Sequence, residues 1–368
     1  MSKITVLHVS EAFGWSGGAA QCLFLAQELR KMGHENLIAS PLGGDLFKKA
    51  AAAGFETYDF SPSGKTDFAA AWELKNIYRS RFVDVVHAHH PKAHNMCLLA
   101  KLFSSRRPVL VVSRRVSHKL PENFLAKMKY KTALVNAYLP VCDYVKKMLI
   151  DYGIDDRRLF TVYSGVDKSR YFKKEKDFAF KRSLNLKEND FLISLIGNFS
   201  SDKGQKIFIE ALALLKKKGF SFSALFAGKN TESDELKKMF YNLLAGEKAV
   251  FLGLRDDVER LLNITDINVN AAIKGEALSG SLREAMACGV PSVASAIAGN
   301  GEILKDGYNG FLFNTGDPVS LAEKLQILME DESLMKKFSA NSVLAIDEKF
   351  TVPKMAQETL KIYLSLLK

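Results

Sequence analysis

The chain has 368 residues, a hydrophobic share of 47%, a charged share of 25% and a formal net charge of +11. This length predicts two domains with full cores, and the absence of any run of about 18 apolar residues argues against a transmembrane helix. The start of the chain resembles a strand and not a signal peptide, and four widely spaced cysteines indicate free thiols, so we expect a cytoplasmic protein.

In the first half, short apolar runs alternate with helical patterns. The expected strands are 4–9, 35–41, 83–88, 109–113 and 139–142. One helix is expected over about 19–32, with Gly33 as its stop, and another should follow the last strand as far as Tyr152. Strands that alternate with helices in this way are typical of βαβ units and a parallel sheet.

The second half repeats this alternation. The expected strands are 191–196, 221–227, 250–253, 267–269 and 292–294, with helices over about 206–218 and from Gly280 onward. We therefore predict an α/β protein made of two facing Rossmann-like domains with a cleft between them. The predicted domains are 1–163 and 164–351. Residues 162–172 form the linker, and a C-terminal helix, 352–368, packs back on the first domain.

The segment "KGEALSGSLREAMACGVP" (274–291) holds two glutamates, Glu276 and Glu284, on either side of a small-residue turn. A helix that begins at this turn directs its N–H groups at a ligand, where they can bind phosphate or sugar oxygens. Glu284 can then accept from a pair of ribose hydroxyls, and Glu276 from a second sugar. The pattern Ser281-x-x-Glu284 is also a capping box, which predicts that Glu284 only caps the helix.

Two glycine-containing turns follow expected strands. "GNFSSDKG" (197–204) brings the backbone close to a ligand, and Lys203 supplies a charge for a diphosphate, although an ordinary turn with a solvated lysine has the same pattern. "GWSGG" (14–18) lacks the full dinucleotide-binding fingerprint and fits either a tight turn or a phosphate contact.

All seven histidines lie between His8 and His118. No acidic or cysteine partner is interleaved with the four in "HAHHPKAH" (87–94), so we expect polar residues lining the cleft and no metal site. In "SRRVSH" (113–118), Arg114 and Arg115 leave a strand end, where they can meet a phosphate or a carboxylated acceptor.

The positive charge is concentrated in residues 73–131, which hold thirteen Lys/Arg against three Asp/Glu, a surplus of 13 − 3 = +10. Within this region and beyond it, 119–137 mixes apolar residues with four lysines. Such a segment can lie on an anionic membrane surface, and it is equally typical of an ordinary surface helix.

Several motifs together carry a family resemblance. "GEALSGSLREAMACGVPSVAS" followed by "AGNGEILKDGYNGFLF" resembles the nucleotide-sugar signature of family 4 glycosyltransferases, which have the two-domain GT-B fold and retain anomeric configuration. "SGGAAQCLFLAQELRKMGHE", "GNFSSDKG" and "YSGVDKSRYF" are similar to the glycine loop, diphosphate loop and linker of the same family. The resemblance covers nearly the whole chain.

The resemblance implies a role for each matching residue. Glu276 would bind the hydroxyls of the donor sugar, Glu284 the ribose and Lys203 the diphosphate. The helix start at Ser279, Gly280 and Ser281 would bind leaving-group oxygens. Further donor contacts are implied for Gly17, Gly18, Asn198, Leu254 and Arg255.

Two positions depart from the family pattern. Asn198 stands where many relatives have an arginine, and Arg114 where many have a histidine near the donor sugar. Arg114, Arg115 or His118 is then the first-domain contact to the reacting sugar; of these we assign a catalytic role to Arg114, with Glu276 and Lys203.

We therefore predict a retaining transferase that moves a sugar from a nucleotide diphosphate sugar, such as a UDP-sugar, to a saccharide or lipid-linked acceptor of a bacterial surface polysaccharide or lipopolysaccharide. It is expected to need no metal or cofactor and to bind no nucleic acid. The alternatives are an epimerase or hydrolase of the same fold, an inactive sugar-binding partner subunit, and a solute-binding protein, which would need an export signal.

Overall fold

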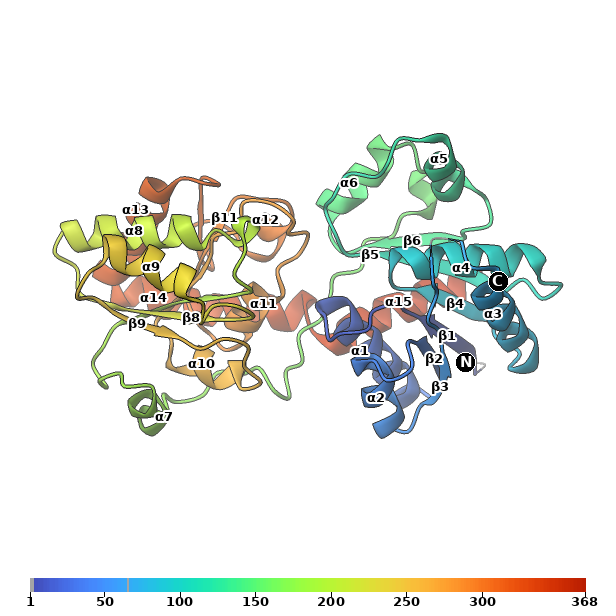
Figure 1. Ribbon diagram of the computed structural model, residues 1–368, viewed down its shortest axis with the longest axis horizontal. Helices are drawn as coiled ribbons and strands as arrows, with labels where there is room; N and C mark the ends of the chain where they lie inside the picture. The colour runs from blue at the N-terminus through green and yellow to red at the C-terminus, as the bar shows by residue number, and fades with distance from the viewer. Residues whose placement is uncertain (1–2, 65) are drawn as a thin grey trace. The chain divides into compact units, whose positions relative to one another are not determined.

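A computed structural model describes residues 3–64 and 66–368 of the chain. It divides into two compact units: unit 1 consists of Met1–Gly165 and Val352–Lys368, and unit 2 of Val166–Thr351. The first boundary lies two residues beyond the expected one, and the C-terminal helix is part of unit 1. Each unit contains one six-stranded sheet, in which every neighbouring pair of strands is parallel (Figure 1).

The sheet of unit 1 has the strand order β3-β2-β1-β4-β5-β6. Its strands are β1 (Thr5–Val9), β2 (Glu35–Ser40), β3 (Glu56–Asp59), β4 (Val85–Ala88), β5 (Val109–Arg114) and β6 (Ala137–Pro140). Its helices are α1 (Gly17–Lys31), α2 (Asp45–Ala52), α3 (Phe68–Ser80), α4 (Pro91–Phe103), α5 (Phe124–Lys131), α6 (Asp143–Asp151), the short η1 (Asp156–Arg158) and α15 (Val352–Leu366).

The sheet of unit 2 has the strand order β12-β11-β10-β7-β8-β9. Its strands are β7 (Leu192–Ile196), β8 (Ser223–Ala227), β9 (Lys248–Phe251), β10 (Ile267–Asn270), β11 (Ser292–Ser295) and β12 (Phe311–Phe313). Its helices are α7 (Phe178–Ser183), η2 (Ser201–Lys203), α8 (Gln205–Lys217), α9 (Asp234–Leu243), α10 (Val258–Ile264), α11 (Gly280–Ala287), α12 (Asn300–Ile303), α13 (Pro318–Glu330) and α14 (Glu332–Lys349).

These parallel sheets confirm the predicted α/β class. Central strands such as β7, with five buried residues, are continuous apolar or small runs because helices cover both faces of a parallel sheet. The core of unit 2 contains a cluster of aromatic rings in which Phe226 stacks on Phe251 and meets the edges of Phe208 and Phe240.

The last helix, α15, completes the core of unit 1. Its Met355, Ala356 and Tyr363 are buried in one cluster with apolar side chains of α1 and of the central strands. The Tyr363 hydroxyl also shares a hydrogen bond of 2.5 Å with Nδ1 of His87 on β4. Unit 1 is therefore built from two segments that are far apart in the sequence, and the red α15 lies against the blue α1 in Figure 1.

The expected amphipathic segment 119–137 is shorter as a helix than its pattern suggested. Only α5, residues Phe124–Lys131, is helical, because Pro121 precedes it and β6 begins at Ala137. None of the helices that the structure describes is both long and apolar enough to span a bilayer.

Candidate active site

A cavity of about 300 Å³ lies in unit 2, at the carboxyl ends of β7, β8 and β10. From β7 the chain continues through β8 and β9 toward one edge of the sheet, and it then returns to form β10 on the opposite flank of β7. The cavity therefore lies at the point where the strand order reverses. Open parallel sheets bind ligands at such a reversal. The expected donor residues that line it are Asn198, Lys203, Leu254, Arg255, Glu276, Ser279, Gly280 and Ser281.

Two glycines allow the loops around this cavity to approach one another. A Cβ on Gly228 would lie 2.4 Å from the carbonyl oxygen of Gly197, and one on Gly204 would lie 1.9 Å from that of Ala271. Gly204 also has a φ of +73°, in the left-handed region that favours glycine. The loop after β7 can therefore lie directly against the end of β10.

We expect Gly204→Ala to lower the free energy of unfolding by about 2–5 kcal/mol, because strain at positive φ adds to a clash with backbone. Gly219 is the matched control, since its φ is +87° and no atom of the described residues lies within 4 Å of the place that an alanine Cβ would occupy. Gly219→Ala should cost only about 1–2 kcal/mol. Denaturant unfolding of both variants measures the difference, and equal losses would contradict the close approach at Gly204.

The helix α11 begins at Gly280, and its N-cap is Ser279, whose Oγ accepts from the N–H of Leu282. Ser281 is therefore inside the helix, and Glu284 lies too far along it to be the third residue of a capping box. The capping-box interpretation of Glu284 is wrong for this reason.

A buried amide chain that the sequence analysis missed orients this helix start. Asn270 at the end of β10 donates through Nδ2 to Ser279 Oγ at 2.8 Å, and Asn300 donates through Nδ2 to Asn270 Oδ1 at 3.2 Å. Asn300 is fully buried. An asparagine at the end of an apolar strand was the available signal at Asn270, whereas the position of Asn300 depends on tertiary structure.

Lys203 and Glu276 form an ion pair in the wall of the cavity through Nζ and Oε1. The Glu276 side chain is only 10% exposed, whereas that of Lys203 is 37% exposed. A second ion pair, Lys274 Nζ to Asp202 Oδ1 at 3.2 Å, joins the same two loops. The carboxylate and the ammonium that the sequence assigned to sugar and diphosphate thus face one another in one cavity.

Glu284 is partly buried and is not among the residues found to line the cavity in the described part of the chain. Burial raises the pKa of its carboxyl to about 7, although Arg283 and Arg170 act to lower it. Arg170 is itself held by Glu259, with 2.8 Å between Nε and Oε2. The Glu284 carboxyl can therefore gain or lose its proton near neutral pH.

Unit 1 has a cavity of its own, of about 270 Å³, at the ends of β4 and β5. Gly18, Arg114 and Arg115 line it, whereas Gly17 is not among its lining residues in the described ranges. A Cβ on Gly18 would lie 2.7 Å from Nε2 of His90, so this glycine permits the contact between the start of α1 and the start of α4. Arg114 donates to the backbone oxygen of His118, whose side chain is exposed.

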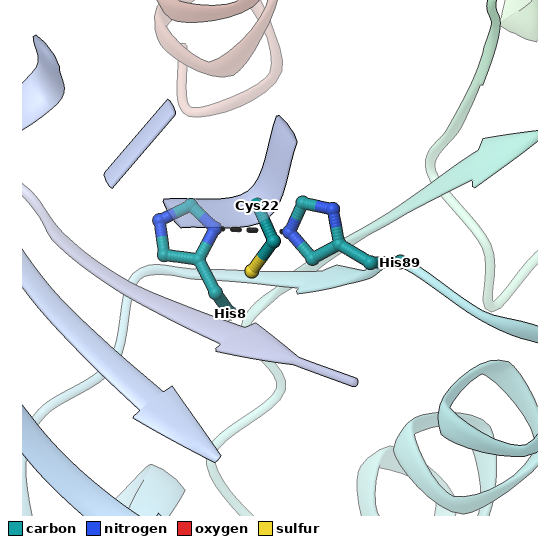
Figure 2. Close-up of side chains that lie close together, drawn as sticks. All are labelled: His8, Cys22 and His89. Carbon is teal, nitrogen blue, oxygen red and sulfur yellow. Dashed lines mark hydrogen bonds between the residues drawn. The ribbon is translucent and has the colours of Figure 1, made fainter. Parts of the chain in front are cut away.

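Beside this cavity, ligand atoms of His8, Cys22 and His89 lie within 4.8 Å of one another, which is close enough to hold a metal ion (Figure 2). Arg115 must donate at 3.1 Å to Nδ1 of His89, because a guanidinium has no acceptor. The proton of neutral His89 is then on Nε2, which donates at 3.1 Å to Nδ1 of His8, and His8 donates through Nε2 to Asn36 Oδ1.

These hydrogen bonds and the protonation of the side chains decide whether His8, Cys22 and His89 are suited to bind a metal ion. Burial lowers the pKa of His8 to about 4 and raises that of the Cys22 thiol to about 12, so both side chains are held neutral. A metal ion would have to bind Nε2 of His89, which carries the proton here. The ion would also lie near the positive charge of Arg115. The residues therefore fit a directed hydrogen-bond chain better than a metal centre.

The basic block 73–131 does not form a single solvated face. Lys101 is buried and donates to Asn136 at 2.6 Å. Arg81 pairs with Glu35 and Glu56, and Arg106 with Asp84. Arg114 and Arg115 line the unit 1 cavity. The concentrated charge is thus distributed among structural pairs, this cavity, the exposed lysines of α5 and other exposed cations such as Arg79, Arg107 and Lys119.

Comparisons with known proteins agree with this architecture. Residues 176–343 match the family model described as "Glycosyl transferases group 1", and residues 15–170 match "Glycosyltransferase Family 4". Over 361 residues the chain is 24% identical to the N-acetyl-alpha-D-glucosaminyl L-malate synthase of Bacillus anthracis, with 94% of this chain and 92% of that protein covered.

Further relatives have the same fold or the same class of activity. An N,N'-diacetylbacillosaminyl-diphospho-undecaprenol alpha-1,3-N-acetylgalactosaminyltransferase of Campylobacter jejuni is 28% identical over 249 residues, which are 66% of this chain and 63% of that one. A Rickettsia africae glycosyltransferase superposes with a TM-score of 0.89 at 23% identity, over all of both chains. HepE of Anabaena in complex with UDP-glucose superposes with a TM-score of 0.83 at 19% identity, over 98% and 100%.

The two sheets, the cavity at the strand reversal and these matches define a glycosyltransferase with two Rossmann-like units. The chain belongs to the family 4 type of the GT-B glycosyltransferases, which confirms the fold and the class of enzyme predicted from its motifs.

Proposed function

We propose that this enzyme is a retaining transferase that takes its sugar from a UDP-sugar bound in the unit 2 cavity. The observation that carries the proposal is the Lys203–Glu276 pair beside the start of α11, at the carboxyl ends of β7 and β10. The ammonium and the helix N–H groups suit a diphosphate, and the buried carboxylate suits sugar hydroxyls. The UDP-glucose complex of Anabaena HepE supports the choice of uridine.

In the proposed reaction, a new bond forms between the anomeric carbon and an acceptor oxygen, and the bond from that carbon to the diphosphate oxygen breaks. The acceptor hydroxyl gives its proton to the departing diphosphate on the same face of the sugar. Lys203 and the start of α11 stabilise the charge that develops on the leaving group, where preorganised donors have their largest effect. Glu276 orients the donor sugar through its hydroxyls.

The test of this function is a thermal-shift screen against UDP, GDP, ADP and their sugars, with Glu284→Ala in parallel. A ligand present at about a hundred times its Kd adds about 2.7 kcal/mol of stability. We expect UDP and a UDP-sugar to stabilise the wild type and to have less effect on the variant. No shift with any nucleotide would reject the function and favour an inactive sugar-binding subunit. Release of free UDP without acceptor would identify a hydrolase or epimerase.

We further propose that the acceptor belongs to a bacterial surface polysaccharide or lipopolysaccharide pathway and that α5 holds the enzyme on an anionic membrane. The name of the Campylobacter jejuni relative, with its diphospho-undecaprenol acceptor, supports a lipid-linked substrate. On α5, Phe124, Leu125 and Met128 are 75%, 75% and 56% exposed, and Lys127 and Lys131 are exposed between and beyond them. Exposed apolar groups interleaved with lysines suit an interfacial helix.

We expect replacement of Phe124, Leu125 and Met128 by serine to weaken binding to phosphatidylglycerol vesicles by about tenfold or more, since three apolar side chains no longer enter the bilayer. Pelleting with vesicles at low salt measures this. The control is Leu243→Ser with Leu344→Ser, which removes two exposed apolar groups from unit 2. Equal binding by all three proteins, or no binding by the wild type, would exclude α5 as the membrane contact.

A further inference from the structure

The unit 1 cavity has cationic groups in its wall that nothing in the described part of the chain neutralises. Neither Arg114 nor Arg115 has a carboxylate within 4.0 Å among the described residues, although both side chains are half-buried. The carboxylate of Glu11 is nearby but accepts from the N–H groups of Lys92 and Ala93 at the start of α4. Buried charge is costly without a partner, so a cavity of this kind favours an anion.

Each arginine also uses little of its capacity to donate. Arg114 donates to the backbone oxygen of His118, and its Nε is buried without a hydrogen-bond partner in the described ranges. Arg115 donates through Nη1 to His89. A guanidinium has five N–H donors in a fixed planar fork, which matches the oxygens of a phosphate or a carboxylate.

A third donor completes the cavity wall. His94, on α4, is 1% exposed and lines the cavity, and its Nε2 has no partner in the part of the chain that the structure describes. The rings of Tyr130 and Tyr138 stand edge-on to it at centroid distances of 5.3 and 5.9 Å. Burial and the nearby cations Lys129 and Arg114 hold the pKa of His94 well below its usual range, so this imidazole is neutral and can donate through Nε2.

We propose that the unit 1 cavity binds an anionic oxygen group of the acceptor, a phosphate or a carboxylate, between Arg114, Arg115 and His94. This inference rests on the proposed function: with the UDP-sugar bound in the unit 2 cavity, unit 1 is left to bind the acceptor. Tyr130, Tyr138, Val112 and Leu149 add apolar and aromatic surface to the same wall, so we expect the anionic group to be attached to an apolar or ring-shaped part of the acceptor. A neutral saccharide would leave the guanidinium groups unneutralised, which selects against it.

The test is calorimetric titration of the full chain with inorganic pyrophosphate and, separately, with succinate, at one fixed low salt concentration. Saturating UDP is present so that the unit 2 cavity is occupied, and each titration is repeated in Lys203→Gln, which weakens phosphate binding there. We expect at least one probe to bind and Arg114→Gln and His94→Phe each to weaken it by about ten- to a hundredfold, since charged hydrogen bonds are lost. A preference for pyrophosphate or for succinate tells the two sources of anion apart.

The controls separate this site from general attraction to a basic protein. Arg107→Gln removes an exposed cation of the same unit and should leave the affinity unchanged. Arg114→Lys keeps the charge and should recover part of the binding if the variants are folded, which circular dichroism checks. Absence of binding by both probes, or equal binding by wild type and Arg114→Gln, overturns the proposal. The heat of UDP binding is measured separately, so a failure of the proposed function is seen independently.

Discussion

Lys203→Met should lower kcat/KM for transfer from the proposed UDP-sugar donor by about 10²–10³-fold, with UDP-glucose as the test donor. The ammonium lies in the cavity wall with the start of α11, where the charge of the leaving diphosphate is expected to develop. Removal of one preorganised donor to such a charge typically has an effect of this size. Initial rates at varied UDP-glucose measure it, and the loss should fall on kcat as well as on KM because the charge grows in the transition state.

Stability and function can be separated at this pair. Lys203→Met leaves the buried Glu276 carboxylate without its cation, which should cost about 1–3 kcal/mol of unfolding free energy. In the double variant Lys203→Met with Glu276→Gln no charge is left unpaired, so stability should return and activity should not.

The matched control for this prediction is Lys274→Met. Lys274 pairs with Asp202 between the same two loops but does not line the cavity in the described structure, so its loss should leave turnover nearly unchanged. If Lys203→Met turned over UDP-glucose as fast as the wild type, Lys203 would not hold the diphosphate.

The affinity for UDP-glucose should depend strongly on pH through Glu284. Its carboxyl has a pKa of about 7 in the free protein, so it is mostly protonated below pH 7 and ionised above. Two ribose hydroxyls that donate to it need the ionised form, so binding releases a proton below pH 7. The apparent Kd should therefore rise by about tenfold for each pH unit below 7 and be nearly constant above it.

Calorimetry between pH 5 and pH 8 measures this profile, and UDP-glucose is the suitable probe because its diphosphate is a diester without a proton to lose near neutral pH. Glu284→Gln should bind more weakly at pH 8 and show a flat profile. A wild-type profile that is equally flat would mean that the ribose does not contact this carboxyl.

Much of the fold follows from local patterns, and the omissions have physical causes. Buried central strands such as β7 and β8 are apolar runs that the sequence predicts well. By contrast, β3 is a half-exposed edge strand with the sequence Glu-Thr-Tyr-Asp, and β12 has only three residues, so neither was predicted. Edge strands need not be apolar, because no neighbouring strand covers their outer edge and solvent reaches it.

The candidate site could be predicted where the chemistry is local to a motif. Lys203, Glu276 and the start of α11 come from turns that directly follow strands, and they line one cavity. The capping-box error at Glu284 arose because Ser279 and Ser281 are both suitable N-caps, and only the hydrogen bonds of Ser279 decide between them. The roles of His94 and Asn300 depend on residues far away in the sequence, which no local pattern shows.

The placement of α15 in unit 1 has a consequence for how the protein is made. During synthesis on the ribosome, every residue of unit 2 has been added by Thr351, before any residue of α15 exists. Until Tyr363 has emerged, the nascent unit 1 exposes the apolar side chains that Met355, Ala356 and Tyr363 later cover, including Leu25 and Val111. Unit 1 therefore cannot complete its core until α15 has been made, and until then these apolar side chains stay uncovered although almost all of the chain exists.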